Sequence, residues 1–162
     1  YEAIEKRDGE FPDGGPVYAH PEGRLAIFVG DLVDRGPRIL DSVRLVRNMV
    51  EAGHAACVPG NHDMKLVRKL RGRDVKITYG LDRTLAEIDA LPDDRRELAE
   101  KELVRFLDGL VSHYVFDEGR LVVAHAGMKE EMQGRGSGKV RDFGDRAQRR
   151  VKFGRAWSGA RS

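Results

Sequence analysis

The sequence has only one cysteine, Cys57, and no segment typical of a membrane span or a secretion leader. One thiol cannot form a disulfide within the chain, which favours a reducing compartment. No run of about 18 consecutive apolar residues is present, so no membrane-spanning helix is predicted. We therefore expect a cytoplasmic protein with no membrane partner.

Two further features are missing: an internal repeat, and the GxxxxGK[ST] loop that cradles phosphates in many nucleotide-binding proteins. The 162 residues, 40% of them hydrophobic, fit one domain or part of one. The chain begins with Tyr1 rather than Met, and we expect it to be a fragment of a longer protein.

The charge is unevenly distributed along the chain. The net charge is +2, but residues 129–162 hold ten Lys/Arg and four Asp/Glu and so carry +6, which leaves −4 for the rest. A basic end suits an anionic partner such as nucleic acid, and it equally suits a solvated tail. The composition leaves both interpretations open.

The chain is organised around residues 28–37, FVGDLVDRGP. The apolar run at 25–29 predicts a buried parallel strand, and ligands of α/β sheets bind beyond the carboxyl ends of such strands. Asp31 and Asp34 offer carboxylate oxygens to a hard cation, and Arg35 offers a planar, bidentate donor to a phosphate. This stretch therefore predicts a site that binds both a metal and a phosphate.

The flanking pattern predicts alternating strands and helices. A short strand is expected at 17–20, a helix from Pro37 to about Gly53, a strand at 54–58 and a helix at 64–70. This order favours a right-handed βαβ unit with parallel strands.

The second half of the chain predicts two more helices and a hairpin. A short helix is expected at 81–88 and a longer one from Pro92 to about Val111, followed by strands at 113–116 and 121–124. The two helices resemble a cap inserted between two halves of a sheet. The apolar stripe of the longer helix consists of Leu98, Leu103, Phe106, Leu107 and Leu110.

Three apolar strands end in polar clusters with flanking glycines: GDxxDRG, GNHD and AHAG. Their key residues are Asp31, Asn61 and His125. Each cluster alone is weak, because Gly-Asp is a common turn and Asn-His occurs by chance. The conjunction of three strand ends is much more specific.

These motifs resemble the calcineurin-like metallophosphoesterase superfamily, in its phosphoprotein-phosphatase branch. The second, third and fourth motifs of that superfamily match residues 30–36, 60–63 and 125–127. Longer phrases look most like the phosphatase domain of bacterial polynucleotide kinase-phosphatase. They are VPGNHDMKL at 58–66, FLDGLVSHY at 106–114 and VAHAGMKEE at 123–131.

The resemblance implies an α/β fold with a metallophosphoesterase-type β-sandwich core flanked by helices, incomplete at both ends. It makes residues 1–143 a partial domain that lacks the first DxH and the last GHT motif of the family. Residues 144–162 are expected to be a divergent basic tail, poorly ordered. We expect such a fragment alone to be weak or inactive.

The resemblance also implies a role for each site residue. Asp31 would bridge two metals, with Asn61 and His125 as further metal ligands. Arg35, Asn61 and His62 would contact the substrate phosphate. His62 would act as an acid at the leaving oxygen, held by Asp34. The mixed nitrogen and oxygen ligands suit Mn²⁺, with Ni²⁺, Co²⁺ or iron as other candidates.

The implied activity is that of a metal-dependent phosphatase that removes 2′-, 3′- or 2′,3′-cyclic phosphates from RNA ends during RNA repair. The implied partners are such RNA ends and an RNA 2′-O-methyltransferase, and the parent chain would carry kinase and ligase domains. One alternative is a serine/threonine protein phosphatase or a dinucleoside-polyphosphate hydrolase. Another is a non-catalytic remnant that binds RNA or a protein partner.

Several residues also have a purely structural interpretation. His62 is then an ordinary first-turn residue of a helix, His125 bonds to the backbone, and Arg35 pairs with Asp34. Asp63 fits a helix N-terminus as well as a functional role. Three other histidines are interpreted as structural: His20, His54 and His113.

Overall fold

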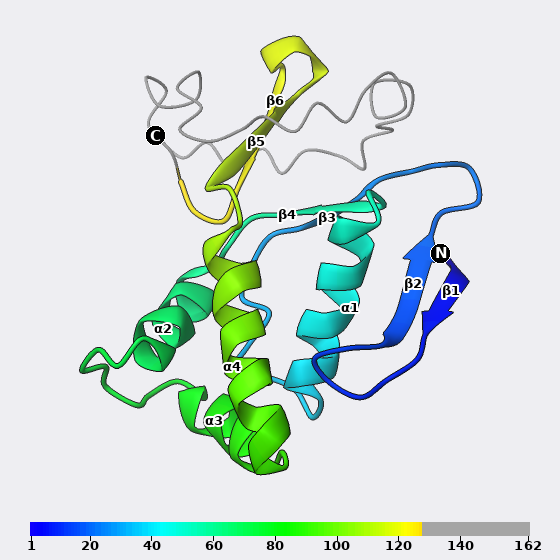
Figure 1. Ribbon diagram of the computed structural model, residues 1–162. Helices are drawn as coiled ribbons and strands as arrows, with labels where there is room; N and C mark the ends of the chain where they lie inside the picture. Colours follow the sequence, from blue (N-terminus) through cyan, green and yellow to red (C-terminus); the bar gives the residue numbers. More distant parts are fainter. Residues whose placement is uncertain (128–162) are drawn as a thin grey trace.

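The computed structural model describes residues 1–127 (Figure 1). Within this range the chain forms four α-helices and three separate two-stranded sheets, so the predicted α/β class is confirmed. In chain order the elements are β1 (Glu2–Arg7), β2 (Gly15–Ala19), β3 (Ala26–Phe28), α1 (Ile39–Glu51), β4 (Ala55–Cys57), α2 (Asn61–Leu70), α3 (Leu81–Asp89), α4 (Asp93–Asp108), β5 (His113–Phe116), a short 3₁₀ turn (Asp117–Gly119) and β6 (Leu121–Ala124). The basic tail predicted at 144–162 lies outside the described residues.

The predicted pairing of parallel strands is confirmed. β3 runs parallel to β4, with Ala26 opposite Ala55 and Phe28 opposite Cys57, and α1 connects the two. In Figure 1, α1, α2 and α4 lie on one side of this pair and the β5–β6 hairpin on the other. β4 is fully buried, but β3 is only half-buried and Val29 after it is 47% exposed. The prediction of a buried strand at 25–29 is therefore wrong for β3, because α1 packs on β4 and β2 and much less on β3.

The start of α1 depends on a residue from another helix. The sequence predicts a start at Pro37, but the helix begins at Ile39. The carboxylate of Glu87 in α3 accepts hydrogen bonds from the backbone N–H groups of Ile39 (2.9 Å) and Leu40 (3.0 Å). Glu87 thus satisfies two of the amide groups that a helix leaves unpaired at its N-terminus.

α2 begins three residues before its predicted start at residue 64. Asp63 stabilises this earlier start, because its carboxylate accepts a hydrogen bond (2.8 Å) from the N–H of Gly60, the residue that caps the helix. The strand-end residues Asn61 and His62 therefore belong to the first helical turn. This placement fixes the direction in which both side chains leave the backbone.

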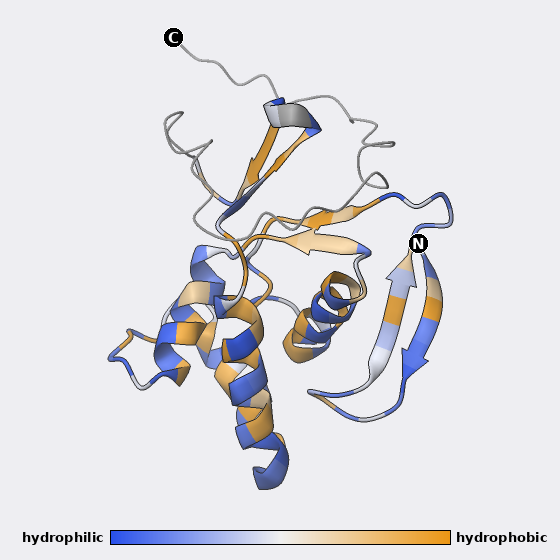
Figure 2. Cartoon of the chain, turned by 45° about the horizontal axis from the view of Figure 1, so that its top comes forward, coloured by the Kyte–Doolittle hydropathy of each residue, from blue (hydrophilic) through white to orange (hydrophobic). Residues whose placement is uncertain are grey.

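α3 and α4 are part of the central core, which corrects the expectation of an inserted cap. Leu81 and Leu107 are fully buried in the same hydrophobic cluster as Ile39 of α1. Leu98 was wrongly placed in the α4 stripe: it is 50% exposed, while the neighbouring Ala99 is buried. The true stripe runs from position 99 through 103, 106 and 107, which are the spacings of one helix face. Figure 2 shows hydrophobic residues along β3 and β4 and a striped pattern on the helices.

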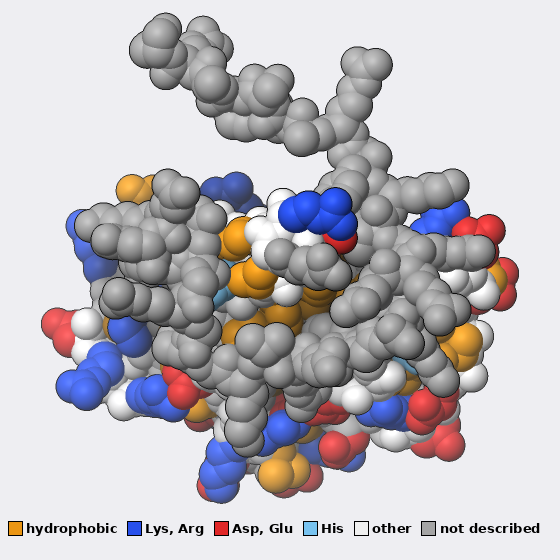
Figure 3. Space-filling model, turned by 90° about the horizontal axis from the view of Figure 1, so that it is seen from above, with side chains coloured by type: hydrophobic (Ala, Val, Ile, Leu, Met, Phe, Trp, Pro, Cys, Tyr) orange, Lys and Arg blue, Asp and Glu red, His pale blue; other side chains and the backbone are white. Residues whose placement is uncertain are grey.

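Two antiparallel hairpins flank this core. The β5–β6 hairpin is as predicted, with His113 opposite Ala124. β2 was predicted, but β1 was missed because its mostly charged, exposed sequence shows no alternation. Asn48 of α1 holds the end of this first hairpin by donating to the carbonyl oxygen of Gly14 (2.9 Å). Seen from the β5–β6 side, charged side chains of both signs surround a centre that contains hydrophobic side chains (Figure 3).

No α-helix among residues 1–127 is both long and apolar enough to cross a membrane.

Candidate active site

The first two motifs lie side by side because they follow the carboxyl ends of the parallel neighbours β3 and β4. Their loops touch at two glycines. A side chain on Gly30 would overlap the backbone of Gly60, and one on Gly60 would overlap the backbone and carboxylate of Asp31. Glycine at both positions lets the two strand ends approach one another.

The loop after β3 has an unusual backbone. Asp31 (φ 55°) and Asp34 (φ 72°) both lie in the left-handed region, although neither is a glycine. Aspartate tolerates this region better than most residues, but each case costs about 1–2 kcal/mol. Such strain persists only where the surrounding structure holds it in place.

Asp63 is the residue that holds this loop. Its side chain is fully buried and accepts three backbone N–H bonds, from Gly60, Asp31 (2.8 Å) and Leu32 (2.9 Å). Burial raises the pKa of Asp63, and the three N–H donors oppose that shift. The structure thus gives Asp63 a structural function, since it ties the acidic loop to the start of α2.

His62, Asp34 and Thr84 form a hydrogen-bonded chain. His62 Nδ1 lies 2.7 Å from Asp34 Oδ2, and the Thr84 hydroxyl donates to Asp34 Oδ1 at 2.7 Å. Thr84 Oγ1 also accepts the backbone N–H of Asp34 at 2.9 Å. Because a carboxylate only accepts, the proton of the first bond belongs to Nδ1 of His62. The Nε2 atom of His62 is therefore the ring position left for a substrate.

The three predicted metal ligands converge from three strand ends. His125 Nε2 lies 3.1 Å from Asn61 Oδ1 and 3.6 Å from Asp31 Oδ1. On its other side, His125 Nδ1 lies 2.6 Å from the carbonyl oxygen of Val29. That carbonyl only accepts, so the Nδ1 atom carries a proton, and Nε2 is the ring nitrogen that faces the two oxygens and is the one that could bind a metal.

This donor set fits a divalent cation. Asp31 Oδ1, Asn61 Oδ1 and His125 Nε2 lie close enough together to offer electron pairs to one cation. The ligand types are one carboxylate, one amide oxygen and one imidazole, a mixture that suits transition-metal ions. Among residues 1–127, no three side chains of His, Cys, Asp or Glu are grouped so that they could hold a metal ion. The donor set described above therefore includes the amide oxygen of Asn61.

Arg35 is exposed and forms no hydrogen bond or ion pair with the residues that the structure describes. The structural interpretation that pairs it with Asp34 is wrong, because the buried carboxylate of Asp34 is already occupied by His62 and Thr84. The guanidinium next to the acidic loop is thus available to an anion.

The other histidines behave as structural residues where the structure shows their contacts. His20 Nδ1 accepts the backbone N–H of Glu22, and the His113 ring bonds to Ser112. No sequence pattern pointed to Thr84, which reaches the site from α3, 50 positions beyond Asp34. A threonine in a helix is unremarkable in sequence, and only its burial against Asp34 reveals its role.

Comparison with known proteins places this geometry in a family. The sequence matches the calcineurin-like phosphoesterases over residues 16–154. It is 42% identical over 143 residues to the asymmetrical bis(5′-nucleosyl)-tetraphosphatase PrpE of Geobacillus thermodenitrificans, which covers 88% of this chain and 58% of that protein. It is 37% identical over 140 residues to the protein of the same name from Bacillus subtilis, with 86% and 57% covered.

The chain thus spans little more than half the length of these curated relatives. The match to the family nevertheless extends over most of the chain and includes all three strand-end motifs. The chain therefore belongs to the calcineurin-like phosphoesterases, hydrolases that use divalent metals.

Proposed function

We propose that the complete protein is a metal-dependent phosphoesterase that hydrolyses dinucleoside polyphosphates. The observation that carries this is the convergence of Asp31, Asn61 and His125 beside the held imidazole of His62. The substrate class follows the name of the relatives, asymmetrical bis(5′-nucleosyl)-tetraphosphatase. The products are then a nucleoside triphosphate and a nucleoside monophosphate.

From the sequence, RNA ends came first and dinucleoside polyphosphates were among the alternatives, and the present proposal reverses that order. The relatives favour the dinucleoside-polyphosphate alternative and give no support to RNA-end repair. The physical reason is that the strand-end motifs supply metal and phosphate chemistry, which many substrates share. They carry no contact to the rest of the substrate.

Asp31, Asn61 and His125 would hold the metal. The bound cation would neutralise phosphate charge and activate the attacking water, which is the chemistry that such metals supply in phosphoesterases. Mn²⁺ is the proposed ion, and binding assays with Mn²⁺, Ni²⁺, Co²⁺ and Fe²⁺ will rank the candidates.

His62 would donate a proton or a hydrogen bond from Nε2 to the oxygen that leaves when the P–O bond breaks. The bond from Nδ1 to Asp34 keeps the ring oriented and keeps the donor on the substrate side. Thr84 fixes Asp34 in turn, so Asp34 and Thr84 are positioning residues. Arg35 would hold two oxygens of the same phosphate, a geometry that lysine cannot reproduce.

A substrate panel tests this proposal. The complete protein is assayed with diadenosine tetraphosphate, a phosphopeptide, and RNA with 3′-phosphate or 2′,3′-cyclic phosphate ends. We expect the highest kcat/KM for the dinucleotide, with ATP and AMP as products. Arg35→Gln and His62→Ala variants should lose most of that activity. A higher kcat/KM for either RNA end or for the phosphopeptide would overturn the assignment.

RNA ends remain the second candidate, on the strength of the phrases at 58–66, 106–114 and 123–131. This candidate brings with it the proposed kinase and ligase domains and the methyltransferase partner. A cytoplasmic location is proposed for either substrate.

A further inference from the structure

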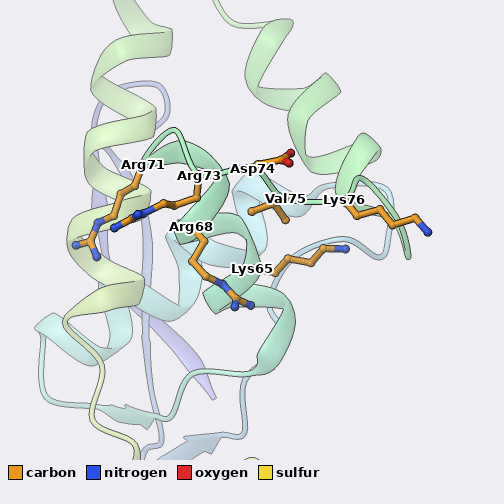
Figure 4. Close-up of a pocket in the computed structure, with 7 residues that line it drawn as sticks. All are labelled: Lys65, Arg68, Arg71, Arg73, Asp74, Val75 and Lys76. Carbon is orange, nitrogen blue, oxygen red and sulfur yellow. The ribbon is translucent and has the colours of Figure 1, made fainter.

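A basic pocket lies on the far half of α2, beyond the residues that form the site. It is a cavity of about 680 Å³. Its lining comes from α2 and from the loop that follows it (Figure 4): Lys65, Arg68, Arg71, Arg73, Asp74, Val75 and Lys76. Five of these side chains are cationic and one is acidic. The volume falls in the range typical of small-ligand sites.

Most of this positive charge is not neutralised by the protein. Arg71 pairs with Asp108 of α4 at 2.6 Å. Within residues 1–127, however, Arg68, Arg73 and Lys76 form no ion pair. Some exposed arginines elsewhere in this range have an acidic partner, as Arg24 has in Glu22, whereas others, such as Arg35, have none. The pocket is nevertheless lined by several cationic side chains without an ion pair in the described part of the chain.

Two residues of the pocket lie on the same face of α2 as the candidate metal ligand Asn61. Asn61, Lys65 and Arg68 are spaced at i, i+4 and i+7, which places them on the same side of the helix. Seven residues of α-helix span about 10 Å along the axis. An anion held at Asn61 can thus extend towards Lys65 and Arg68.

An exposed aromatic ring, that of Tyr79, lies close to Lys65. Tyr79 is 80% exposed and lies in the left-handed region (φ 61°). The ammonium group of Lys65 is 5.7 Å from the centre of its ring. The same ammonium donates to the carbonyl and the hydroxyl of Thr78, both at 2.9 Å. The loop is thereby anchored next to the pocket with much of the aromatic surface of Tyr79 open to solvent.

We propose that this pocket binds the distal part of the substrate: phosphates beyond the one that is attacked, with the distal base stacked on Tyr79. The inference rests on the proposed function, because it assigns a second subsite to the same substrate. Arg73 and Lys76 would contact the distal phosphates, and the ring of Tyr79 would contact the base. Both types of contact are established ways to bind nucleotides.

A small nucleotide fits the pocket better than an RNA strand does. RNA binding requires basic side chains along an extended path, since each bound phosphate needs its own cation. Here the unpaired cations gather around one concave site at the end of α2. The pocket thus matches the phosphates of one nucleotide.

The test compares two pairs of substitutions by calorimetry with EDTA present, so that nothing is hydrolysed. The first variant is Arg73→Gln/Lys76→Gln. The matched control is Lys6→Gln/Arg24→Gln, with Lys6 in β1 and Arg24 in the loop between β2 and β3; in Figure 1 the β1–β2 hairpin lies on the opposite side of α1 from α2. The probes are tripolyphosphate, diadenosine tetraphosphate and a single-stranded RNA decamer. We expect the first variant to weaken binding of tripolyphosphate and of the dinucleotide about tenfold. The control should bind both as the parent protein does.

Two further variants test the ring. Tyr79→Ala should weaken binding of the dinucleotide but not of tripolyphosphate. Tyr79→Phe keeps the ring and should bind the dinucleotide as the parent protein does. Under turnover, the Arg73→Gln/Lys76→Gln variant should raise the ratio of KM for the dinucleotide to KM for an aryl phosphate about tenfold.

Unchanged binding of both phosphate probes in the first variant would overturn the proposal, and so would a loss confined to RNA. Absence of hydrolysis with every dinucleotide would overturn the proposed function instead. The binding measurements would still decide the pocket in that case, because they require no turnover.

Discussion

At the scale of single residues, the site depends on side chains that hold other side chains. Thr84 donates to Asp34 and accepts its backbone N–H, and Asp34 holds the imidazole of His62. Asp34 and Thr84 are both buried, so neither can replace a lost partner with bulk water. Removing the hydroxyl of Thr84 from this hydrogen-bonded chain should therefore lower both the stability of the fold and kcat.

Thr84→Val tests the chain directly. Valine keeps the shape but leaves one carboxylate oxygen and the N–H of Asp34 unpaired, which should reduce the free energy of unfolding by about 1–3 kcal/mol. We expect kcat to fall about tenfold, less than the roughly 100-fold or greater fall for loss of the His62 acid. Urea unfolding and the pH profile of kcat measure the two effects.

Thr84→Ser is the control for this prediction, since it restores the hydroxyl and should recover both quantities. A valine variant with an unchanged pH profile and unchanged kcat would show that Thr84 has no positioning role.

Cys57 provides a prediction about pH. Burial, with a smaller contribution from the charge of Asp63, raises the pKa of Cys57 from 9.0 to about 12. As the pH rises through this window, the unfolded chain releases the thiol proton while the folded chain retains it. Stability should therefore be complete below pH 9 and fall above it, by at most about 1.4 kcal/mol per pH unit.

The check is urea unfolding of the parent protein and of Cys57→Ala at several pH values in this window. The slope of unfolding free energy against pH should be less steep in the variant, since lysine and tyrosine titrations are common to both proteins. The native thiol should also resist Ellman's reagent below pH 9, and rapid labelling of the folded protein would contradict its burial.

At the scale of secondary structure, helix starts are fixed by partners that lie far away in sequence. Glu87 of α3 caps α1 through two N–H groups. Asp63 accepts a hydrogen bond at the start of α2 and also holds the loop after β3. Each carboxylate links two elements, so helix formation and assembly of the site are coupled.

Glu87→Ala should destabilise the protein by about 1–2 kcal/mol, because two N–H groups of the first turn of α1 lose their acceptor. Hydrogen exchange should speed up at Ile39 and Leu40 first. Glu100→Ala, which removes a helix-surface glutamate with no ion pair in the described part of the chain, is the matched control and should change stability by less than about 0.5 kcal/mol. Equal effects from the two substitutions would refute the capping role.

At the scale of the whole molecule, the parallel pair β3–β4 and the β5–β6 hairpin bring together residues that are 30 to 94 positions apart. Asp31, Asn61 and His125 meet only because the three strand ends meet. The His125 ring is oriented by its hydrogen bond from Nδ1 to the carbonyl oxygen of Val29, the residue that follows β3. Metal affinity should therefore report on assembly of the whole fold.

Mn²⁺ binding, followed by electron paramagnetic resonance of the free ion, tests this convergence without turnover. Asp31→Asn and His125→Ala should each weaken binding at least about tenfold. His20→Ala removes a histidine that follows β2 and whose ring accepts the backbone N–H of Glu22, and this variant should bind Mn²⁺ as the parent does. Equal affinities for all four proteins would show that these residues are not the metal ligands.

Much of the fold could be predicted from local patterns. The helices, β4 and the β5–β6 hairpin follow from apolar periodicity and turn residues, which act over a few positions. β1 could not, because its charged sequence becomes a strand only by pairing with β2. Leu98 was misplaced because Leu98 and Ala99 both fit an apolar face until packing selects one of them.

Residue types and their spacing were enough to predict the carboxylate, amide, imidazole and guanidinium groups at three strand ends, and with them the family. The folded chain was needed to see that Thr84 supports Asp34, that Asp63 holds the strained loop, and that the basic residues after α2 line one pocket. The physical reason is range. Residue type and spacing fix what a group can do, whereas contacts across 50 positions exist only once the core has packed.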